Sequence, residues 1–272
     1  MENYSIIMSV YNKVNPDHLK ISIESILNQT YKTNEFILIK DGKLTDKQEE
    51  VINDIVSKNS KIFKIFEFDE NKGAGVAYNK GIEECKNKWA AIMDSDDYAV
   101  NTKFEKQMAY LEKHSDIDII GTNAIEFVDD IENKISTRIM PEKHDEIVKF
   151  GHGRCPIIQP TAIFNVDAVR AVGSYQHSPL TEDYDLYIRM IMKGYKFYTF
   201  QEVLYYVRTS SDFFKRRGGF SYLKPILGFK YKYYKKGFFS FKEFLKTFLS
   251  SFIVSVMPNS LRKAVYLKFL RN

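Results

Sequence analysis

Cysteine and long apolar runs are both scarce in this chain of 272 residues. Its two cysteines, Cys85 and Cys155, lie far apart and at no spacing typical of a metal site, so we expect free thiols in a reducing compartment. No basic region precedes the first apolar run, which predicts no signal peptide and a cytoplasmic location. The uncharged window at residues 247–259 is shorter than the roughly 20 residues of a membrane-spanning helix, so no such helix is expected.

Acidic residues are almost missing from the C-terminal segment, residues 213–272. This segment contains 14 lysines and arginines and a single acid, Glu243, and therefore carries a charge of +13. Because the whole chain carries +5, the first 212 residues carry −8. The segment also contains 16 phenylalanines and tyrosines, a mixture that suits an anionic membrane surface or a nucleic acid. No RNA-binding motif supports a nucleic acid, so we expect helices that associate with a membrane surface, with packing of these helices on the core as the alternative.

Apolar runs alternate with helical patterns along the chain. The apolar runs predict strands at residues 4–10, 36–39, 62–68, 89–93, 117–121 and 160–164. Amphipathic patterns predict helices over residues 15–30, 46–60 and 103–114, and two further helices that begin near Ala77 and His144. A strand, a helix and a strand that ends in an acid, Asp41, are typical of a nucleotide-binding βαβ unit.

The apolar run at residues 89–93 ends abruptly in Asp94, Asp96 and Asp97. Alternating carboxylates at the end of a strand can share one hard cation, Mg²⁺ or Mn²⁺, which can then hold a diphosphate. A solvated acidic turn is the alternative. Asp41 could likewise accept a hydrogen bond from a base or a ribose, or could belong to an ordinary Asp-Gly turn.

Two other segments contribute candidate site residues. Gly73 and Gly75 allow the backbone to approach a phosphate or a sugar closely, although their spacing is not that of a Walker loop. Thr181 is placed to cap a helix with Glu182 and Asp183 in its first turn, where carboxylates suit the helix dipole. That pattern alone favours a structural role for the second acidic cluster.

Five ordered motifs together resemble the inverting glycosyltransferases of family 2. They are Ser9-Val10-Tyr11-Asn12, Ser25-Ile26-Leu27-Asn28-Gln29-Thr30, Asp41-Gly42, Asn71-x-Gly73 with Asn79-x-Gly81, and Met93-Asp94-Ser95-Asp96-Asp97. The resemblance covers residues 4–210 and implies an α/β GT-A fold, a Rossmann-like mixed sheet flanked by helices. It implies a nucleotide-sugar-binding half at residues 1–98 and an acceptor-binding half at 99–212. Residues 213–272 then form the basic, aromatic helical extension expected at the membrane.

The resemblance also implies roles for individual residues. Asp96 would coordinate Mn²⁺ or Mg²⁺, Asp183 would act as the catalytic base, and Glu182 would bind or orient the acceptor. Nucleotide contacts are implied for Val10, Tyr11, Asn12, Asp41, Asn71, Gly73, Asn79 and Asp94. A third metal ligand is left open between His152, His177 and water. Arg216 and Arg217 could hold a diphosphate or form a solvated basic turn.

An inverting glycosyltransferase is therefore the predicted function. The resembling subgroup builds O-antigen, capsule or exopolysaccharide units, which implies a nucleotide-sugar donor, UDP by resemblance, and a polyprenyl-diphosphate-linked glycan acceptor at the inner face of the cell membrane. The Gln-x-x-Arg-Trp motif of the processive synthases is absent, so one sugar per encounter is expected. A non-catalytic subunit that binds nucleotide sugar at the membrane is the alternative; the presence of both Asp96 and Asp183 argues against it, because binding alone needs no base. The oligomeric state is left open.

Overall fold

The computed structural model describes residues 1–209 and 219–257, so Arg216 and Arg217 lie outside the described residues. The strands are β1 (Tyr4–Val10), β2 (Glu35–Lys40), β3 (Phe63–Glu67), β4 (Trp89–Asp94), β5 (Tyr98–Ala99), β6 (Ile119–Val128), β7 (Asp130–Arg138), β8 (Ile163–Asn165) and β9 (Phe197–Arg208). The α-helices are α1 (Pro16–Leu27), α2 (Asp46–Asn59), α3 (Ala74–Glu84), α4 (Lys103–Lys113), α5 (His144–Gly151), α6 (Val166–Ala171), α7 (Glu182–Met192), α8 (Phe220–Lys235) and α9 (Phe241–Val256). A short 3-10 helix, η1 (Gln159–Thr161), precedes β8.

One mixed sheet organises this part of the chain. Its order is β3-β2-β1-β4-β8-β6-β9-β5, with β7 paired to β6 beside this path. Strands β1 to β4 are parallel, and β8 is antiparallel to both β4 and β6. The chain moves outward from β1 to β3 and then returns through α3 to β4, on the opposite side of β1. This reversal creates a switch point at the carboxyl ends of β1 and β4, where open α/β sheets bind ligands.

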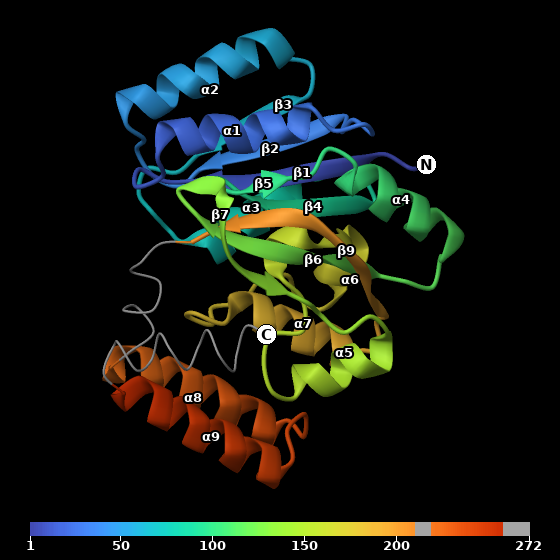
Figure 1. Ribbon diagram of the computed structural model, residues 1–272, viewed down its shortest axis with the longest axis vertical. Coiled ribbons are helices and arrows are strands. Elements are labelled where there is room, and N and C mark those ends of the chain that lie inside the picture. Colours follow the sequence, from blue (N-terminus) through green and yellow to red (C-terminus); the bar gives the residue numbers. More distant parts are fainter. Residues whose placement is uncertain (210–218, 258–272) are drawn as a thin grey trace.

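Helices cover both faces of the parallel strands (Figure 1). Successive strand residues point to opposite faces, so Ile6 and Met8 pack with α1, α2 and α4, whereas Ile7 packs with α3, α6 and α7. Gly81 lets α3 approach β1 closely, because a Cβ atom there would lie 2.3 Å from Cγ2 of Ile7. The predicted fold class, a mixed α/β sheet flanked by helices, is confirmed.

Three local predictions need correction. Helix α3 begins at Ala74 rather than near Ala77, because Gly73, with φ of +87°, ends the preceding loop at the helix N-cap. The strand expected at residues 160–164 is reduced to β8 because η1 occupies residues 159–161, where Pro160 has no N–H for a strand ladder. Strands β5, β7 and β9 and helix α6 were not predicted; of these, β7 is an exposed, polar strand with little apolar alternation.

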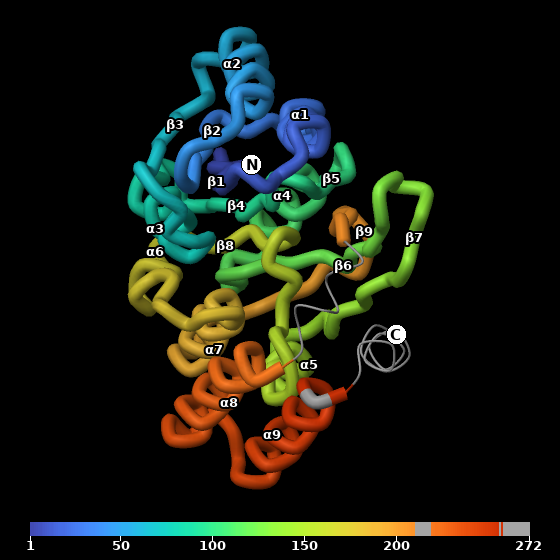
Figure 2. Tube along the Cα trace, turned by 90° about the vertical axis from the view of Figure 1, so that its left-hand side faces the viewer, coloured from blue at the N-terminus to red at the C-terminus, as the bar shows by residue number. Residues whose placement is uncertain are grey.

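Helices α8 and α9 form a hairpin at the end of the molecule opposite α2 (Figures 1 and 2). Gly237, with φ of +79°, ends α8, and the Ser240 side chain caps α9. The hairpin packs on α7 through Tyr184 and Ile188 of α7 and the rings of Phe229 and Tyr233 of α8. Neither α8, α9 nor any other helix in the described ranges is long and apolar enough to cross a bilayer.

Candidate functional site

The carboxyl ends of three neighbouring strands bring predicted nucleotide-site residues to one edge of the sheet. In the sheet register Val10 is the partner of Lys40, which precedes Asp41, and Ser9 is the partner of Asp94. Val10, Asp41 and Asp94 therefore lie at about the same level on β1, after β2 and on β4. This edge is also the switch point of the sheet, so the candidate site lies where the topology predicts a ligand.

The Asp41 carboxylate anchors the loop that precedes α3. Its Oδ1 accepts a hydrogen bond from the backbone N–H of Lys72 at 2.7 Å, and its Oδ2 accepts one from that of Gly73 at 3.0 Å. Asn71 Nδ2 donates to the carbonyl oxygen of Asp41 at 3.3 Å. A Cβ atom on Gly42, which has φ of +87°, would lie 2.7 Å from the backbone nitrogen of Asn71. Asp41 and Gly42 thus form a turn that also shapes the Asn71–Gly73 wall of the site.

Other predicted nucleotide contacts differ in their surroundings. Tyr11, Asn12 and Asn71 are exposed at the carboxyl edge of the sheet, where a ligand can reach them. Asn79 is instead used internally: its Nδ2 donates to the carbonyl oxygen of Tyr175 at 2.7 Å, and its Oδ1 accepts from the Tyr175 N–H at 2.8 Å. Asn79 therefore ties α3 to the loop before α7, a structural use that the sequence did not indicate.

The side chain of Asp94 is half-buried at the end of β4 and is held by two neighbours. The Tyr78 hydroxyl donates to its Oδ1 at 3.1 Å, and the Ser22 hydroxyl donates to its carbonyl oxygen at 2.8 Å. Burial and the nearby charge of Asp96 raise the pKa of Asp94 to about 7. Closely spaced carboxylates of this kind favour a bound cation or proton, because both cannot easily remain charged alone.

Arg208, at the end of β9, fixes the acidic turn and was not singled out from the sequence. Its backbone N–H donates to Asp97 Oδ1 at 2.7 Å, and its Nε donates to the carbonyl oxygen of Asp96 at 2.9 Å. Its guanidinium lies 4.5 Å from the ring centre of Phe127 and donates to the carbonyl oxygen of Asp129. Arg208 therefore joins the β4 turn to the β6–β7 hairpin. Its distance along the chain from the acidic motif explains why no local pattern indicated it.

Helix α7 brings the second acidic cluster to the same site. Burial raises the pKa of both Glu182 and Asp183. At Asp183 this rise is opposed by hydrogen bonds from the Tyr184 N–H at 2.7 Å and from the Cys155 thiol at 3.4 Å. The charge of Asp183 also helps to raise the pKa of Asp94, so the two carboxylates lie within electrostatic reach of each other.

The start of α7 differs in detail from the predicted cap. Thr181 occupies the N-cap position, but its hydroxyl pairs with the Ser178 hydroxyl at 2.8 Å and caps no backbone N–H. The predicted side-chain cap is therefore wrong. Across the site, a Cβ atom on Gly75 would lie 3.8 Å from Cβ of Glu182, so the first turn of α3 faces the first turn of α7. Gly75 leaves room between these two helices.

The strand-end carboxylates fit a divalent cation that protein and ligand hold jointly. No group of three or more His, Cys, Asp or Glu side chains within residues 1–209 and 219–257 could hold a metal by itself. Mg²⁺ and similar cations are commonly bound by one or two carboxylates together with the phosphates of a substrate. Asp94 and Asp96 can provide the carboxylates. Of the two candidate third ligands, His152 pairs with α9, where its Nδ1 lies 2.8 Å from Glu243 Oε1. His177 is exposed on the loop before α7.

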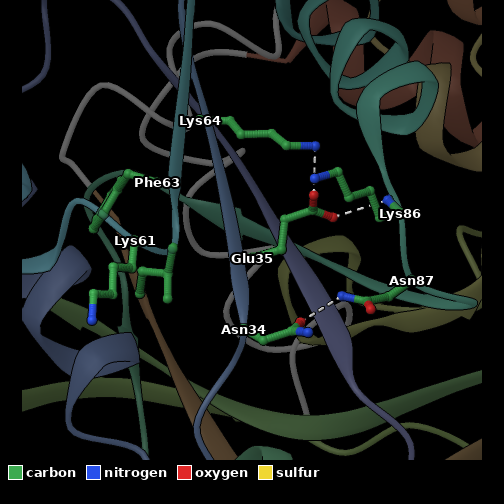
Figure 3. Close-up of a pocket in the computed structure, with 8 residues that line it drawn as sticks. Asn34, Glu35, Lys61, Phe63, Lys64, Lys86 and Asn87 are labelled. Atoms are coloured by element: carbon green, nitrogen blue, oxygen red, sulfur yellow. Dashed lines mark hydrogen bonds and ion pairs between the residues drawn. The ribbon is translucent and has the colours of Figure 1, made fainter.

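A separate pocket of about 170 Å³ lies at the opposite edge of the sheet (Figure 3). Glu35 closes one side of it, accepting from Lys64 Nζ at 2.6 Å and from the Lys86 N–H at 3.0 Å. The full lining is Asn34, Glu35, Lys61, Ile62, Phe63, Lys64, Lys86 and Asn87. No predicted site residue lines this pocket, and it lies at the amino ends of β2 to β4, so it is distinct from the candidate site.

The chain matches the model of the family described as Glycosyl transferase family 2 over residues 5–173. A glycosyltransferase of Haemophilus influenzae is 34% identical over 98% of this chain and 99% of its own length. The amylovoran biosynthesis glycosyltransferase AmsE of Erwinia amylovora is 33% identical over 81% of this chain and 82% of its own. An Escherichia coli UDP-Gal:α-D-GlcNAc-diphosphoundecaprenol β-1,3-galactosyltransferase is 29% identical over 98% of this chain and 96% of its own.

Solved structures show the same fold. The mannosyltransferase PcManGT from Pyrobaculum calidifontis, in complex with GDP-Man and Mn²⁺, aligns with a TM-score of 0.66 at 14% identity, over 96% of this chain and 72% of that one. S. aureus TarS 1-349, in complex with UDP-GlcNAc, aligns with a TM-score of 0.65 at 13% identity, over 98% of this chain and 71% of that one. At these identities the likeness concerns the fold, which is that of the GT-A glycosyltransferases.

Proposed function

The chain belongs to glycosyl transferase family 2 and is a glycosyltransferase, and we propose that it moves one sugar from a UDP-sugar to a glycan acceptor with inversion of the anomeric centre. One arrangement supports this proposal: the Asp94–Asp96 strand end lies at the switch point of the sheet, and Asp183 of α7 lies within electrostatic reach of Asp94. A nucleotide-binding protein without transfer activity has no need for a base. The raised pKa of Asp183 suits general-base work, because a more basic carboxylate takes a proton more readily.

In the proposed reaction, residues 1–98 hold the donor. Asp41 and the loop of Val10, Tyr11 and Asn12 border the nucleotide, together with the wall that Asn71 and Gly73 form. When bound at Asp96 beside Asp94, the cation supplies positive charge that stabilises the diphosphate leaving group. This division of labour needs no protein nucleophile.

The transfer itself is assigned to α7 and the acceptor half, residues 99–212. Asp183 accepts the proton of an acceptor hydroxyl while that oxygen attacks the anomeric carbon, and the bond from this carbon to the diphosphate oxygen breaks on the opposite face. Glu182, beside it, orients the acceptor. One C–O bond forms as another breaks, and the nucleoside diphosphate leaves with the bonding electrons, so a single displacement inverts the centre.

The acceptor is proposed to be a glycan on a polyprenyl diphosphate, in surface polysaccharide biosynthesis. The name of the E. coli relative specifies a diphosphoundecaprenol-linked acceptor and a UDP donor, and that of the Erwinia relative specifies amylovoran biosynthesis. We further propose that the protein works at the inner face of the cell membrane, where such a lipid is anchored. The basic, aromatic composition of residues 213–272 supports this.

The test compares transfer by the wild type with transfer by Asp183→Asn. Purified protein is given Mn²⁺, a panel of UDP-, GDP- and dTDP-sugars, and a synthetic lipid-diphosphate sugar acceptor. We expect transfer from a UDP-sugar to fall by a factor of roughly 100 or more in Asp183→Asn while UDP binding persists. Asp167→Asn, which changes an exposed carboxylate in the first turn of α6, serves as the matched control.

The stereochemistry of the product provides a second readout. An α-linked donor should give a β-linked product, which NMR of the anomeric proton distinguishes. Undiminished transfer by Asp183→Asn would contradict the assigned base, and retention of configuration would contradict the single displacement. Binding of UDP without turnover on any acceptor would instead favour the non-catalytic subunit.

A further inference from the structure

The outward side of α9 is apolar. Phe241, Leu245, Leu249, Phe252 and Ile253 are between 42% and 61% exposed. Their spacing of three and four residues places them on one side of the helix, as a continuous stripe. Single exposed apolar residues are common, but five aligned along one helix form a surface that ordinarily has a binding partner. We call these five residues the α9 stripe.

The inward side of α9 is, by contrast, partly polar. Thr247 is 8% exposed and donates its hydroxyl to the carbonyl oxygen of Glu243 at 2.8 Å. Ser255 is 4% exposed, and its carbonyl oxygen accepts from the Gly219 N–H at 3.0 Å. A helix that served only to cover a core would place its Leu and Ile inward and its Ser and Thr outward. Phe244 also faces inward and packs on the cluster of α7 and α8, so α9 carries apolar residues on both sides, and those of the outward side indicate an apolar surrounding outside the hairpin.

Lysines border the α9 stripe. Lys242 and Lys246 are exposed on α9, and Lys235 and Lys236 are exposed in the last turn and C-cap of α8, beside the hairpin turn. Apolar and aromatic side chains with flanking lysines are typical of helices that lie in the interface of an anionic bilayer. We propose that the α9 stripe and these lysines dock the hairpin on an anionic phospholipid membrane. This inference deepens the proposed function, since it names the surface on which a lipid-linked acceptor would be met.

The hairpin is firmly joined to the helix that carries Asp183. Asp185 of α7 is fully buried and accepts hydrogen bonds from Lys232 Nζ at 2.5 Å and from the Tyr233 hydroxyl at 2.7 Å, both on α8. Lys230 of α8 also reaches α7, donating to the Tyr184 hydroxyl at 3.1 Å. Docking of α9 would thus hold α7 at a fixed place relative to the bilayer. The acceptor headgroup would then be presented to Asp183 from the membrane side.

Vesicle sedimentation tests this surface. The full chain is incubated with vesicles of phosphatidylcholine alone or of phosphatidylcholine mixed with phosphatidylglycerol, and the bound fraction is measured. We expect binding to the mixed vesicles only, weakened by a factor of roughly ten or more in Leu249→Glu. The matched control is Ile21→Glu on α1, since Ile21 is 43% and Leu249 is 49% exposed and both changes add one negative charge. Lys242→Gln with Lys246→Gln should weaken binding and reduce its sensitivity to salt.

Three outcomes would overturn the docking surface. They are no binding by the wild type, equal loss in Ile21→Glu and Leu249→Glu, and displacement of vesicles by poly(U) RNA, which would identify a nucleic-acid surface. Far-UV circular dichroism checks that each variant is folded. Transfer to a water-soluble acceptor without vesicles should be equal in Leu249→Glu and wild type. Absence of transfer by both would contradict the proposed function and leave the vesicle result standing, so the two failures can be told apart.

Discussion

At the scale of single residues, the thiol beside the proposed base is the most informative contact. The pKa of Asp183 is raised, because the effect of burial exceeds the opposing effect of the hydrogen bonds from the Tyr184 amide and the Cys155 thiol. Burial and the neighbouring Asp183 charge raise the pKa of Cys155 itself, so at neutral pH it stays a neutral S–H donor. Cys155 therefore tunes the base without competing with it for the substrate proton.

Replacement of this thiol should move the pH profile of transfer. In Cys155→Ala the ionised form of Asp183 loses one hydrogen bond, so its pKa rises and the acid limb of kcat/KM moves to higher pH. In Cys155→Ser a stronger O–H donor takes the place of S–H, so the limb should return toward or below its wild-type position. The alkaline plateau should change by no more than roughly twofold. Identical acid limbs in all three proteins would show that Asp183 does not set this limb.

Gly81 allows a stability prediction with a close internal control. A Cβ atom in Gly81→Ala would lie 2.3 Å from Cγ2 and 3.1 Å from Cγ1 of Ile7, in the buried contact of α3 with β1. Overpacking of this kind should lower the free energy of unfolding by about 1–3 kcal/mol, measured by urea denaturation. Gly228→Ala, in α8, meets nothing within 4 Å and should raise it by about 0.5–1 kcal/mol. Loss of stability in both would implicate the helices rather than the Ile7 contact.

At the scale of helices and strands, the parallel half was predictable because its strands are buried on both sides. Residues 4–10 and 36–39 read as apolar runs for this reason, and β1 and β2 occupy them. Strand β7 escaped prediction because an exposed edge strand needs no apolar face, as its sequence from Asp130 to Arg138 illustrates. Burial alone does not make a strand predictable, since β9 was also missed although Phe197 and Tyr205 are fully buried; the exposed polar pair Gln201-Glu202 interrupts its apolar pattern.

The candidate site was predictable where chemistry is concentrated in a short motif. Asp94, Asp96 and Asp183 stand out as carboxylates at the end of an apolar run or the start of a helix. Arg208 and Cys155 did not, because each meets its acidic partner only through the tertiary fold. The prediction that the Thr181 side chain caps α7 was wrong for a related reason. Its hydroxyl forms a hydrogen bond with the hydroxyl of Ser178 instead of with a backbone N–H.

The junction between α7 and α8 should depend on one carboxylate. Burial opposes ionisation of Asp185, but hydrogen bonds from Lys232, Tyr233 and Arg189 outweigh it and lower its pKa. We expect Asp185→Asn to lower the free energy of unfolding by about 1–3 kcal/mol near neutral pH, since buried donors lose a charged acceptor. Limited proteolysis should also cut the α7–α8 region faster. Asp54→Asn, which removes an exposed pair with Lys58, should change stability by less than about 0.5 kcal/mol.

The pH dependence of this difference has a definite sign. A carboxyl whose pKa is depressed on folding stabilises the protein at pH values above its unfolded pKa, and this contribution disappears as the pH falls through the folded pKa. The difference in the free energy of unfolding between wild type and Asp185→Asn should therefore be largest at neutral pH. It should decrease in acid, at pH values below the ordinary pKa range of an aspartate. A difference that increased in acid would show that Lys232, Tyr233 and Arg189 do not stabilise the ionised carboxylate.

At the scale of the whole molecule, charge is distributed unevenly along the chain. Residues 1–212 carry −8 and hold the acidic site, whereas residues 213–272 carry +13 and include the α8–α9 hairpin. The hairpin lies at the end of the molecule opposite α2, so this polarity would orient the chain near an anionic surface before any contact forms (Figure 2). Such orientation would turn the hairpin, and with it α7, toward the membrane.

Ligand binding should be visible in the stability of the entire chain. A ligand that binds only the folded state at about 100 times its Kd adds about 2.7 kcal/mol, which for a chain of this size raises Tm by roughly 5–10 °C. We expect UDP with Mn²⁺ to give a rise of this kind, and UDP with EDTA to give much less, because in the proposed site the carboxylates of Asp94 and Asp96 hold the diphosphate only through the cation. In Asp96→Asn the increment due to Mn²⁺ should disappear, whereas Asp116→Asn, at an exposed turn after α4, should respond as the wild type does. If the rise in Tm due to Mn²⁺ persisted in Asp96→Asn, the cation would have to be bound by other residues.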